Sequence, residues 1–256
     1  MAGSNLEPRS AADLIPLFAW HPDHLRAVTD AVLEGHLGRW AAAGDAARLS
    51  IGCYEIFGGR PEPDAARDLT RSLAAPRELI FGNDAGWRRE LQGIFGERVH
   101  DRPMTSFDSD GLDSVHLEKL AASLPSAARL VRFDATLARE LDAELVPHAL
   151  EVFADAIDFA ERGIGYGVLV DNRLACAATS YGISARAVEV AIATRPSFRG
   201  RGFAGAAAAR LFMHCLAQGR RPSWNASNPV SKRLAQRLGM RPAGECEVLF
   251  LTAASA

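Results

Sequence analysis

The sequence has no long apolar segment, and its cysteines are few and scattered. No apolar run approaches the roughly 20 residues that span a bilayer, so no membrane span is expected. Residues 1–7 lack the basic start and apolar stretch of a signal peptide, which predicts a cytoplasmic protein. The four cysteines, at positions 53, 176, 215 and 246, include no pair at metal-ligand spacing. We therefore expect reduced, buried thiols and no bound metal.

A strong excess of charge, internal repeats and low-complexity segments are also missing. The formal net charge of −2 at pH 7 argues against a general nucleic-acid binder. The chain has 256 residues, of which 48% are apolar and 23% charged, and this is enough for one large or two small domains. Composition therefore indicates a globular protein but selects no function. A monomer or a homodimer is expected.

The most informative segment is a predicted strand, a basic glycine loop and a predicted helix in immediate succession. The strand is Val188–Thr194, the loop contains Arg199-Gly-Arg-Gly202, and an alanine-rich helix starts at Phe203. The first N–H groups of a helix have no intrahelical acceptor, and the helix dipole adds positive charge there. Glycines permit positive φ and close approach of a ligand, while arginines pair with phosphate oxygens. The junction therefore predicts a phosphate or pyrophosphate site.

A plain turn is the alternative interpretation, with glycine for conformation and arginine for solubility. The order of strand, loop and helix favours the phosphate interpretation, because a bound phosphate needs all three. The spacing differs from the three-glycine dinucleotide fingerprint, and the Gly-Lys-Ser/Thr ending of a P-loop is missing.

This loop resembles the acyl-CoA loop of the GNAT N-acetyltransferase superfamily. The family motif is Gln or Arg, two residues, Gly, one residue, then Gly or Ala, and Arg199, Gly202 and Ala204 match it in order. The predicted elements over residues 128–256 also follow the order of the GNAT fold.

A later segment is similar to the fifth strand and fourth helix of the same family. Asn228, Ser231, Leu234 and Gly239-Met240 match its pattern of Asn, two residues, Ala or Ser, then Leu-Tyr and Gly-Phe. The preceding Trp224 looks like that of a GNAT subgroup with an extra N-terminal lobe.

The resemblance implies a fold, a co-substrate and a set of contacts. The expected fold class is α/β (α+β), the GNAT acyl-CoA transferase fold, with a mixed, mostly antiparallel sheet and flanking helices over residues 126–256. An N-terminal α/β lobe over residues 1–125 is expected to cover the acceptor site. Acetyl-CoA is the expected donor. The residues expected to bind it are Ile192, Ala193, Thr194, Arg199, Gly200, Arg201, Gly202, Phe203, Ala204, Asn228 and Ser231.

Two catalytic roles are assigned on the same basis. Glu189, on the fourth strand of the family's sheet, is the candidate base that removes a proton from the attacking amine. A solvent-facing strand residue is the alternative interpretation. Ala235 stands where the family has a tyrosine that protonates the departing thiolate, so Ser231 or a water molecule is the candidate acid. For Asn228 a simple helix cap is equally open, and Trp224 is more often a core residue than a ligand contact.

The sequence indicates less about the site that binds the acceptor. A cationic amine could be attracted by Glu151, Asp155 and Asp158, although a solvated helix face is the alternative interpretation. The expected reaction is acetyl transfer to a primary amine of a small molecule. An aminoacyltransferase that uses aminoacyl-tRNA and a non-catalytic acyl-CoA-binding module stay open as alternatives.

Periodicity predicts the remaining elements by residue range. Strands are predicted over 49–57, 77–81, 99–107, 128–133, 165–170, 173–181, 188–194, 222–226 and 245–251, and helices over 22–40, 63–74, 84–95, 115–124, 136–145, 151–162, 203–218 and 229–238.

Overall fold

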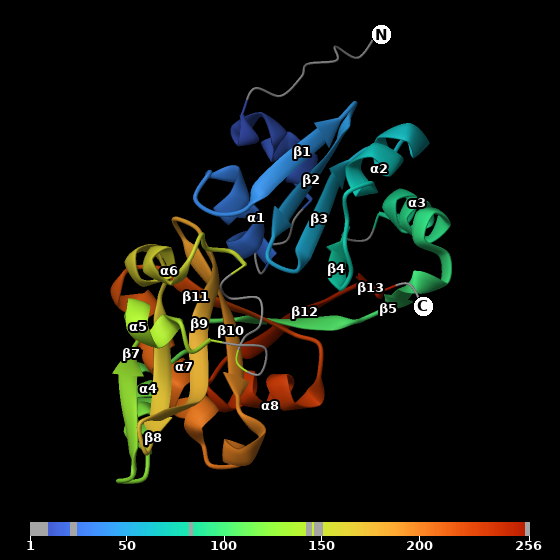
Figure 1. Cartoon of the computed structure of the whole chain (residues 1–256). Helices are drawn as coiled ribbons and strands as arrows, with labels where there is room; N and C mark the ends of the chain where they lie inside the picture. Colours follow the sequence, from blue (N-terminus) through green and yellow to red (C-terminus); the bar gives the residue numbers. More distant parts are fainter. Residues whose placement is uncertain (1–9, 21–24, 82–83, 142–144, 146–150, 254–256) are drawn as a thin grey trace.

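The computed structural model describes residues 10–20, 25–81, 84–141, 145 and 151–253, and it contains two β-sheets (Figure 1). The first sheet has the order β1-β2-β3-β4-β13-β5 and the second β12-β6-β11-β10-β9-β8-β7. Among the described strands, only β3–β4 and β10–β11 pair in parallel. The predicted mixed, mostly antiparallel sheet with flanking helices is confirmed.

The bounds of the elements are as follows. The first sheet contains β1 (Arg39–Ala43), β2 (Ala46–Ile51), β3 (Tyr54–Gly59), β4 (Arg77–Ile80), β5 (Val99–Asp101) and β13 (Val248–Leu251). The second contains β6 (Met104–Asp108), β7 (Ala128–Arg132), β8 (Gly165–Val170), β9 (Arg173–Ile183), β10 (Ala187–Thr194), β11 (Arg221–Ala226) and β12 (Arg241–Cys246). The helices are η1 (Ala11–Phe18), α1 (Arg26–Leu33), α2 (Pro63–Thr70), α3 (Ala85–Phe95), η3 (Gly96–Arg98), α4 (Ser114–Ala121), α5 (Ala135–Ala138), α6 (Ala156–Arg162), η4 (Pro196–Phe198), α7 (Phe203–Ala217) and α8 (Pro229–Arg237).

Local signals predict several elements correctly. Asp171 and Asn172 both have positive φ and join β8 to β9 as the predicted two-residue turn. Gly219 has φ +69° just beyond α7, at the predicted end of the helix. Asn228 caps α8 through its side chain, which accepts from the Ser231 N–H.

The chain crosses from one sheet to the other within two of the predicted strands, so both strand predictions are wrong. The predicted strand 99–107 is divided into β5 in the first sheet and β6 in the second. Pro103, which has no N–H for a ladder, lies at the break. The predicted strand 245–251 is likewise divided into β12 and β13, which belong to different sheets (Figure 1). The predicted lobe boundary at residues 125 and 126 stays a prediction, but strands from each side of it enter both sheets.

Glycines at positive φ make two further predictions wrong. The predicted strand 49–57 is the hairpin β2–β3, because Gly52 at φ +52° reverses the chain. The predicted helix 22–40 ends at Leu33, since Gly35 and Gly38 have positive φ and β1 then begins. Residues 21–24 at its start lie outside the described residues.

Two helices between β7 and β8 are shorter than predicted. The predicted helix 136–145 is described only as α5, which ends at Ala138, and residues 142–144 lie outside the described residues. The predicted helix 151–162 begins at Ala156, because the Asp155 side chain accepts from the N–H groups of the first turn.

One hydrophobic core joins the two sheets. Val28 of α1, Ile56 of β3 and Val188 of β10 are buried in the same cluster. Helix α7 packs on β8, β9 and β10 with its run Ala206–Ala209, whose small side chains let the helix lie close to the sheet. The two sheets are therefore held together by a common core as well as by the chain segments that cross between them.

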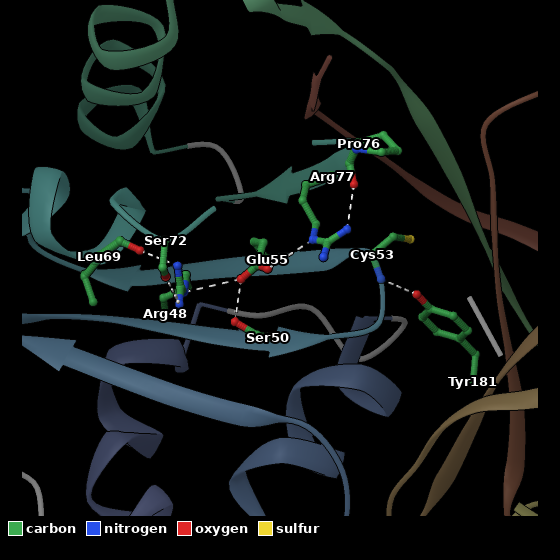
Figure 2. A network of polar contacts seen from close by, with 9 residues as sticks. All are labelled: Arg48, Ser50, Cys53, Glu55, Leu69, Ser72, Pro76, Arg77 and Tyr181. Atoms are coloured by element: carbon green, nitrogen blue, oxygen red, sulfur yellow. Dashed lines mark hydrogen bonds and ion pairs between the residues drawn. The ribbon is translucent and has the colours of Figure 1, made fainter. Parts of the chain in front are cut away.

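A buried ionic network holds strands β2, β3 and β4 together beside this junction (Figure 2). The Glu55 carboxylate contacts Arg48 Nε at 3.3 Å and Arg77 Nε at 3.5 Å, and it accepts from the Ser50 hydroxyl. Arg48 also donates to the Leu69 carbonyl. Because Arg48 and Glu55 are buried and Arg77 is half-buried, loss of one partner would leave a charge uncompensated in the protein interior.

The β2–β3 turn contacts the second sheet directly. The Tyr181 hydroxyl of β9 accepts from the backbone N–H of Cys53 (Figure 2). A Cβ added to Gly52 would lie 1.9 Å from that hydroxyl oxygen. Gly52 is thus required by its backbone conformation and by its neighbour.

We predict that Gly52→Ala lowers the free energy of unfolding by about 3 kcal/mol, because left-handed strain and a steric clash add. Gly44→Ala is the matched control, since Gly44 has φ +54° and only open space where a Cβ would lie. The control should lose about 1 kcal/mol. Urea unfolding of both variants is the measurement, and equal losses would contradict the steric role of Tyr181.

Candidate active site

Strands β10 and β11 separate after a short parallel pairing. The paired residues are Ala187–Glu189 with Arg221–Ser223, and among the described residues the two strands pair no further. Beyond this point β10 remains paired with β9, with Ile192, Ala193 and Thr194 opposite Ala178, Ala177 and Cys176. The backbone edge of Ile192–Thr194 that does not pair with β9 therefore faces β11. A ligand placed between β10 and β11 would need this edge for hydrogen bonding.

The loop after β10 presents a concave set of backbone N–H groups. Gly200 and Gly202 have φ +77° and +81°, and Gly202 is the N-cap of α7 without a side-chain cap. Among the described residues, the N–H groups of residues 200–205 donate to no protein acceptor. Left-handed glycines alternating with other residues form such anion-binding concavities. Cβ positions at both glycines open into free space, so the loop can admit a phosphate.

The side chains of the loop are arranged around this backbone. Arg199 Nε donates to the Thr194 carbonyl at 3.2 Å, and Arg201 Nη2 donates to the Ser197 carbonyl at 3.3 Å. Both arginines are exposed, whereas Phe203 is buried in the core and Ala204 is half-buried. Phe203 and Ala204 can therefore serve a ligand through their N–H groups rather than their side chains.

Glu189 lies at the point where β10 and β11 separate. Its side chain is 2% exposed, so the interpretation as a solvent-facing strand residue is wrong. Burial raises the pKa of the Glu189 carboxyl to about 7, although hydrogen bonds from Ser223 and Asn225 oppose the shift. Oε1 accepts from Asn225 Nδ2 at 3.0 Å, and Oε2 has no hydrogen-bond partner among the described residues. The carboxyl therefore has a free oxygen and a pKa suited to proton transfer near neutral pH.

The partners that hold Glu189 could not be found from sequence. Asn225 of β11 accepts at Oδ1 from the Ser106 hydroxyl at 2.6 Å, and Ser106 belongs to β6. This bond orients the Asn225 amide so that its nitrogen points to Glu189. The short polar segment around Asn225 could have indicated Asn225 as a functional residue. Ser106 gave no such indication, because it lies 119 residues away in the chain.

The polar groups at the start of α8 are hydrogen-bonded to one another. Asn228 Oδ1 accepts from the Ser231 N–H at 2.9 Å, and Ser231 Oγ accepts from Trp224 Nε1 at 2.8 Å. Trp224 is a core residue packed on the Phe212 ring. Ala235 is fully buried in the same cluster. Ser231 keeps a hydroxyl hydrogen to donate, while no polar group stands at position 235.

The expected acidic residues of the acceptor side are not brought together as one site. Asp155 caps α6, and Asp158 pairs with Arg162 on the same helix. Glu151 instead lines a cavity of about 510 Å³ between the first sheet and the segment before α6. The cavity is lined by Gly38, Arg39, Ser50, Ile51, Gly52, Arg77, Glu151, Val152, Phe153 and Ala154.

Comparison with known proteins decides the family. A model of the GNAT acetyltransferase family matches residues 21–249, which contain strands of both sheets. The chain belongs to this family. The match extends well beyond the half of the chain over which sequence motifs indicated a resemblance.

Relatives of this GNAT protein agree with the assignment. "Uncharacterized N-acetyltransferase YdfB" of Bacillus subtilis (strain 168) is 28% identical over 179 residues, which cover 69% of this chain and 67% of the relative. A GCN5-related N-acetyltransferase-like protein of Streptococcus suis has a TM-score of 0.80 at 24% identity, covering 94% of this chain and 98% of that one. A GCN5-related N-acetyltransferase of Kribbella flavida has a TM-score of 0.60 at 14% identity, covering 96% and 98%. At these identities the two structures show a common fold.

Two further features bear on the chemistry and placement of this GNAT protein. The described part of the chain contains no group of three or more His, Cys, Asp or Glu side chains that could hold a metal ion. None of its described helices has the length and apolar character needed to cross a bilayer.

We predict that acetyl-CoA raises the melting temperature of the wild-type protein and that Gly202→Trp abolishes this stabilisation. The indole would fill the space in front of the N–H groups of residues 200–205. Gly219→Trp is the matched control, because Gly219 has φ +69°, open surroundings and a place at the opposite end of α7. Thermal shift with acetyl-CoA is the measurement. Equal ligand-induced shifts in the two variants would exclude the loop as the pyrophosphate site.

We predict that Glu189→Gln is more stable than wild type at pH 8 but not at pH 4. The pKa of Glu189 rises from 4.5 to about 7 on folding, so the folded state holds the proton more tightly. The stability contributed by this tighter proton binding is therefore fully present below pH 4.5 and is lost as pH rises through 7. The difference at pH 8 should be about 3 kcal/mol. Urea unfolding at both pH values is the measurement, and a pH-independent difference would show that Glu189 is not the group responsible.

Proposed function

We propose that this GNAT protein transfers the acetyl group of acetyl-CoA to a primary amine of a small molecule. The observation that carries the proposal is Glu189, a buried carboxyl with a pKa of about 7 and a free oxygen at the separation of β10 and β11. An amine near neutral pH is mostly ammonium and must lose a proton before it attacks a thioester. A carboxylate with this pKa can accept that proton.

The donor side of the proposal rests on the loop and the free strand edge. The N–H groups of residues 200–205 would hold the pyrophosphate, with Arg199 and Arg201 adding charge. The backbone of Ile192, Ala193 and Thr194 would pair with the pantetheine arm and polarise the acyl carbonyl. Fixing both substrates in this way can supply much of the rate enhancement of a two-substrate reaction.

The proton donor to the departing thiolate is assigned to Ser231 or a water molecule. Ser231 Oγ accepts from Trp224 and so has its hydrogen available. Asn228 would contact the CoA arm through the part of its amide that the cap leaves unused. Residues 1–125 would cover the acceptor site, because α1 packs on β9 and β10.

A screen of primary amines with acetyl-CoA, read as thiol release, tests the function. Wild type should release thiol with at least one amine, and kcat/KM for that amine should rise with pH through an apparent pKa near 7. Glu189→Gln should lower kcat by about 10²- to 10³-fold, because it removes the base. Ser231→Ala belongs in the same series and should lower kcat if Ser231 is the acid.

Glu118→Gln, an exposed substitution on α4, is the control and should leave the rate unchanged. Binding of acetyl-CoA without thiol release from any amine would favour a regulatory module. A Glu189→Gln enzyme with wild-type rate and pH profile would overturn the catalytic assignment.

A further inference from the structure

A β-bulge places Tyr181 beside Glu189. Gly182 of β9 lies opposite Glu189, and Ser180 lies opposite Val190, so Tyr181 is the extra residue between these pairs. Bulges of this kind redirect a side chain out of the regular ladder. Tyr181 reaches the β2–β3 turn of the first sheet, where its hydroxyl accepts from the Cys53 N–H (Figure 2).

This contact brings a second tyrosine to the same place. Tyr54 follows Cys53, and its ring lies edge-on to the Tyr181 ring with a centroid distance of 5.4 Å and an interplanar angle of 79°. The Tyr54 side chain is half-buried, whereas Tyr181 is 4% exposed. The first sheet therefore places a phenol against Tyr181, next to the register position of Glu189.

Tyr54 differs from the other tyrosines in its hydrogen bonding. The chain has three tyrosines. The Tyr166 hydroxyl is bonded to His214 Nδ1 at 2.9 Å, and the Tyr181 hydroxyl to Cys53. The Tyr54 hydroxyl makes no hydrogen bond with the described residues, and the residue is half-buried. A polar group in this state is available to a ligand.

The surroundings of Tyr54 carry negative charge. Glu78 is its register partner on β4, and Arg102 donates to Glu78 Oε1 at 3.0 Å. Burial raises the pKa of Tyr54 well above its ordinary value, and the carboxylates of Glu78 and Glu189 add to the shift. The phenol therefore stays neutral at working pH, and its oxygen can accept a hydrogen bond from an ammonium group.

We propose that Tyr54 is a catalytic residue of the acceptor site, whose oxygen accepts a hydrogen bond from the acceptor nitrogen while Glu189 Oε2 takes its proton. The inference rests on the proposed acetyl transfer. It makes the acceptor site a composite of both sheets and selects alkylammonium acceptors over anionic ones.

The proton balance follows from these two contacts. The ammonium gives one proton to Glu189 and keeps an N–H bond to Tyr54, which directs the nitrogen lone pair at the thioester carbon. The C–N bond forms, the C–S bond breaks, and the thiolate leaves with the electron pair. One proton ends on the thiol and one passes to solvent, while Tyr54 is unchanged.

Tyr54→Phe is the first test. We expect kcat/KM for the amine to fall about 10- to 100-fold, because a hydrogen bond to a charged group is lost. KM for acetyl-CoA and the melting temperature should not change, since the hydroxyl has no protein partner among the described residues. Tyr166→Phe should retain full activity, and Tyr181→Phe should lower the melting temperature. An unchanged kcat/KM for the amine in Tyr54→Phe would overturn the assignment.

A second measurement needs no turnover. With 3-fluorotyrosine incorporated, the three tyrosines give three ¹⁹F resonances, which the three Tyr→Phe variants assign. We expect n-butylamine or 2-phenylethylamine, added with CoA, to shift the Tyr54 resonance but not that of Tyr166.

The two measurements separate this inference from the proposed function. A shifted Tyr54 resonance without thiol release from any amine would refute acetyl transfer but support the acceptor site. Thiol release with an unmoved resonance and an unaffected Tyr54→Phe variant would refute the role of Tyr54 alone. An unmoved resonance without thiol release would overturn both.

Discussion

The exchange of strands between the two sheets is the constraint on which the active-site region depends. The chain passes from β5 of the first sheet to β6, which lies between β11 and β12 of the second sheet. It later passes from β12 of the second sheet to β13, which lies between β4 and β5 of the first sheet. Each crossing strand is hydrogen-bonded on both edges, so the sheets cannot separate without breaking backbone ladders. The shared core that contains Val28, Ile56 and Val188 adds apolar burial to the same junction. The separation of β10 from β11 is therefore built on a rigid base.

The same exchange supports the buried carboxyl. Ser106, on the crossing strand β6, orients Asn225, and Asn225 holds Glu189. A carboxyl buried with one oxygen unpartnered costs stability, because its charged form is poorly solvated. The proposed role of Glu189 in proton transfer would account for a carboxyl in so unfavourable an environment. The unpartnered oxygen of Glu189 thus lies where β10 and β11 separate.

The proposed donor and acceptor ends of the site differ in their physical basis. The donor end is local, because one loop with Gly200 and Gly202 at positive φ supplies unpaired N–H groups to solvent. The acceptor end is assembled from distant segments, since Glu189, Tyr181 and Tyr54 come from three strands of two sheets. Variation in the first sheet would therefore change acceptor selectivity while the donor loop stays constant.

The sequence by itself determined the features that depend on neighbouring residues. The β10–loop–α7 junction, the Asp171-Asn172 turn and the Asn228 cap were all predictable, because turn and cap chemistry acts over a few residues. Apolar runs such as 99–107 and 245–251 were each interpreted as one strand, since periodicity does not reveal that a run changes sheets. Only the tertiary structure decided that Glu189 is buried, that Ser106 supports it, and that Tyr54 lies nearby. These facts depend on which strands pair, and strand pairing joins residues far apart in the chain.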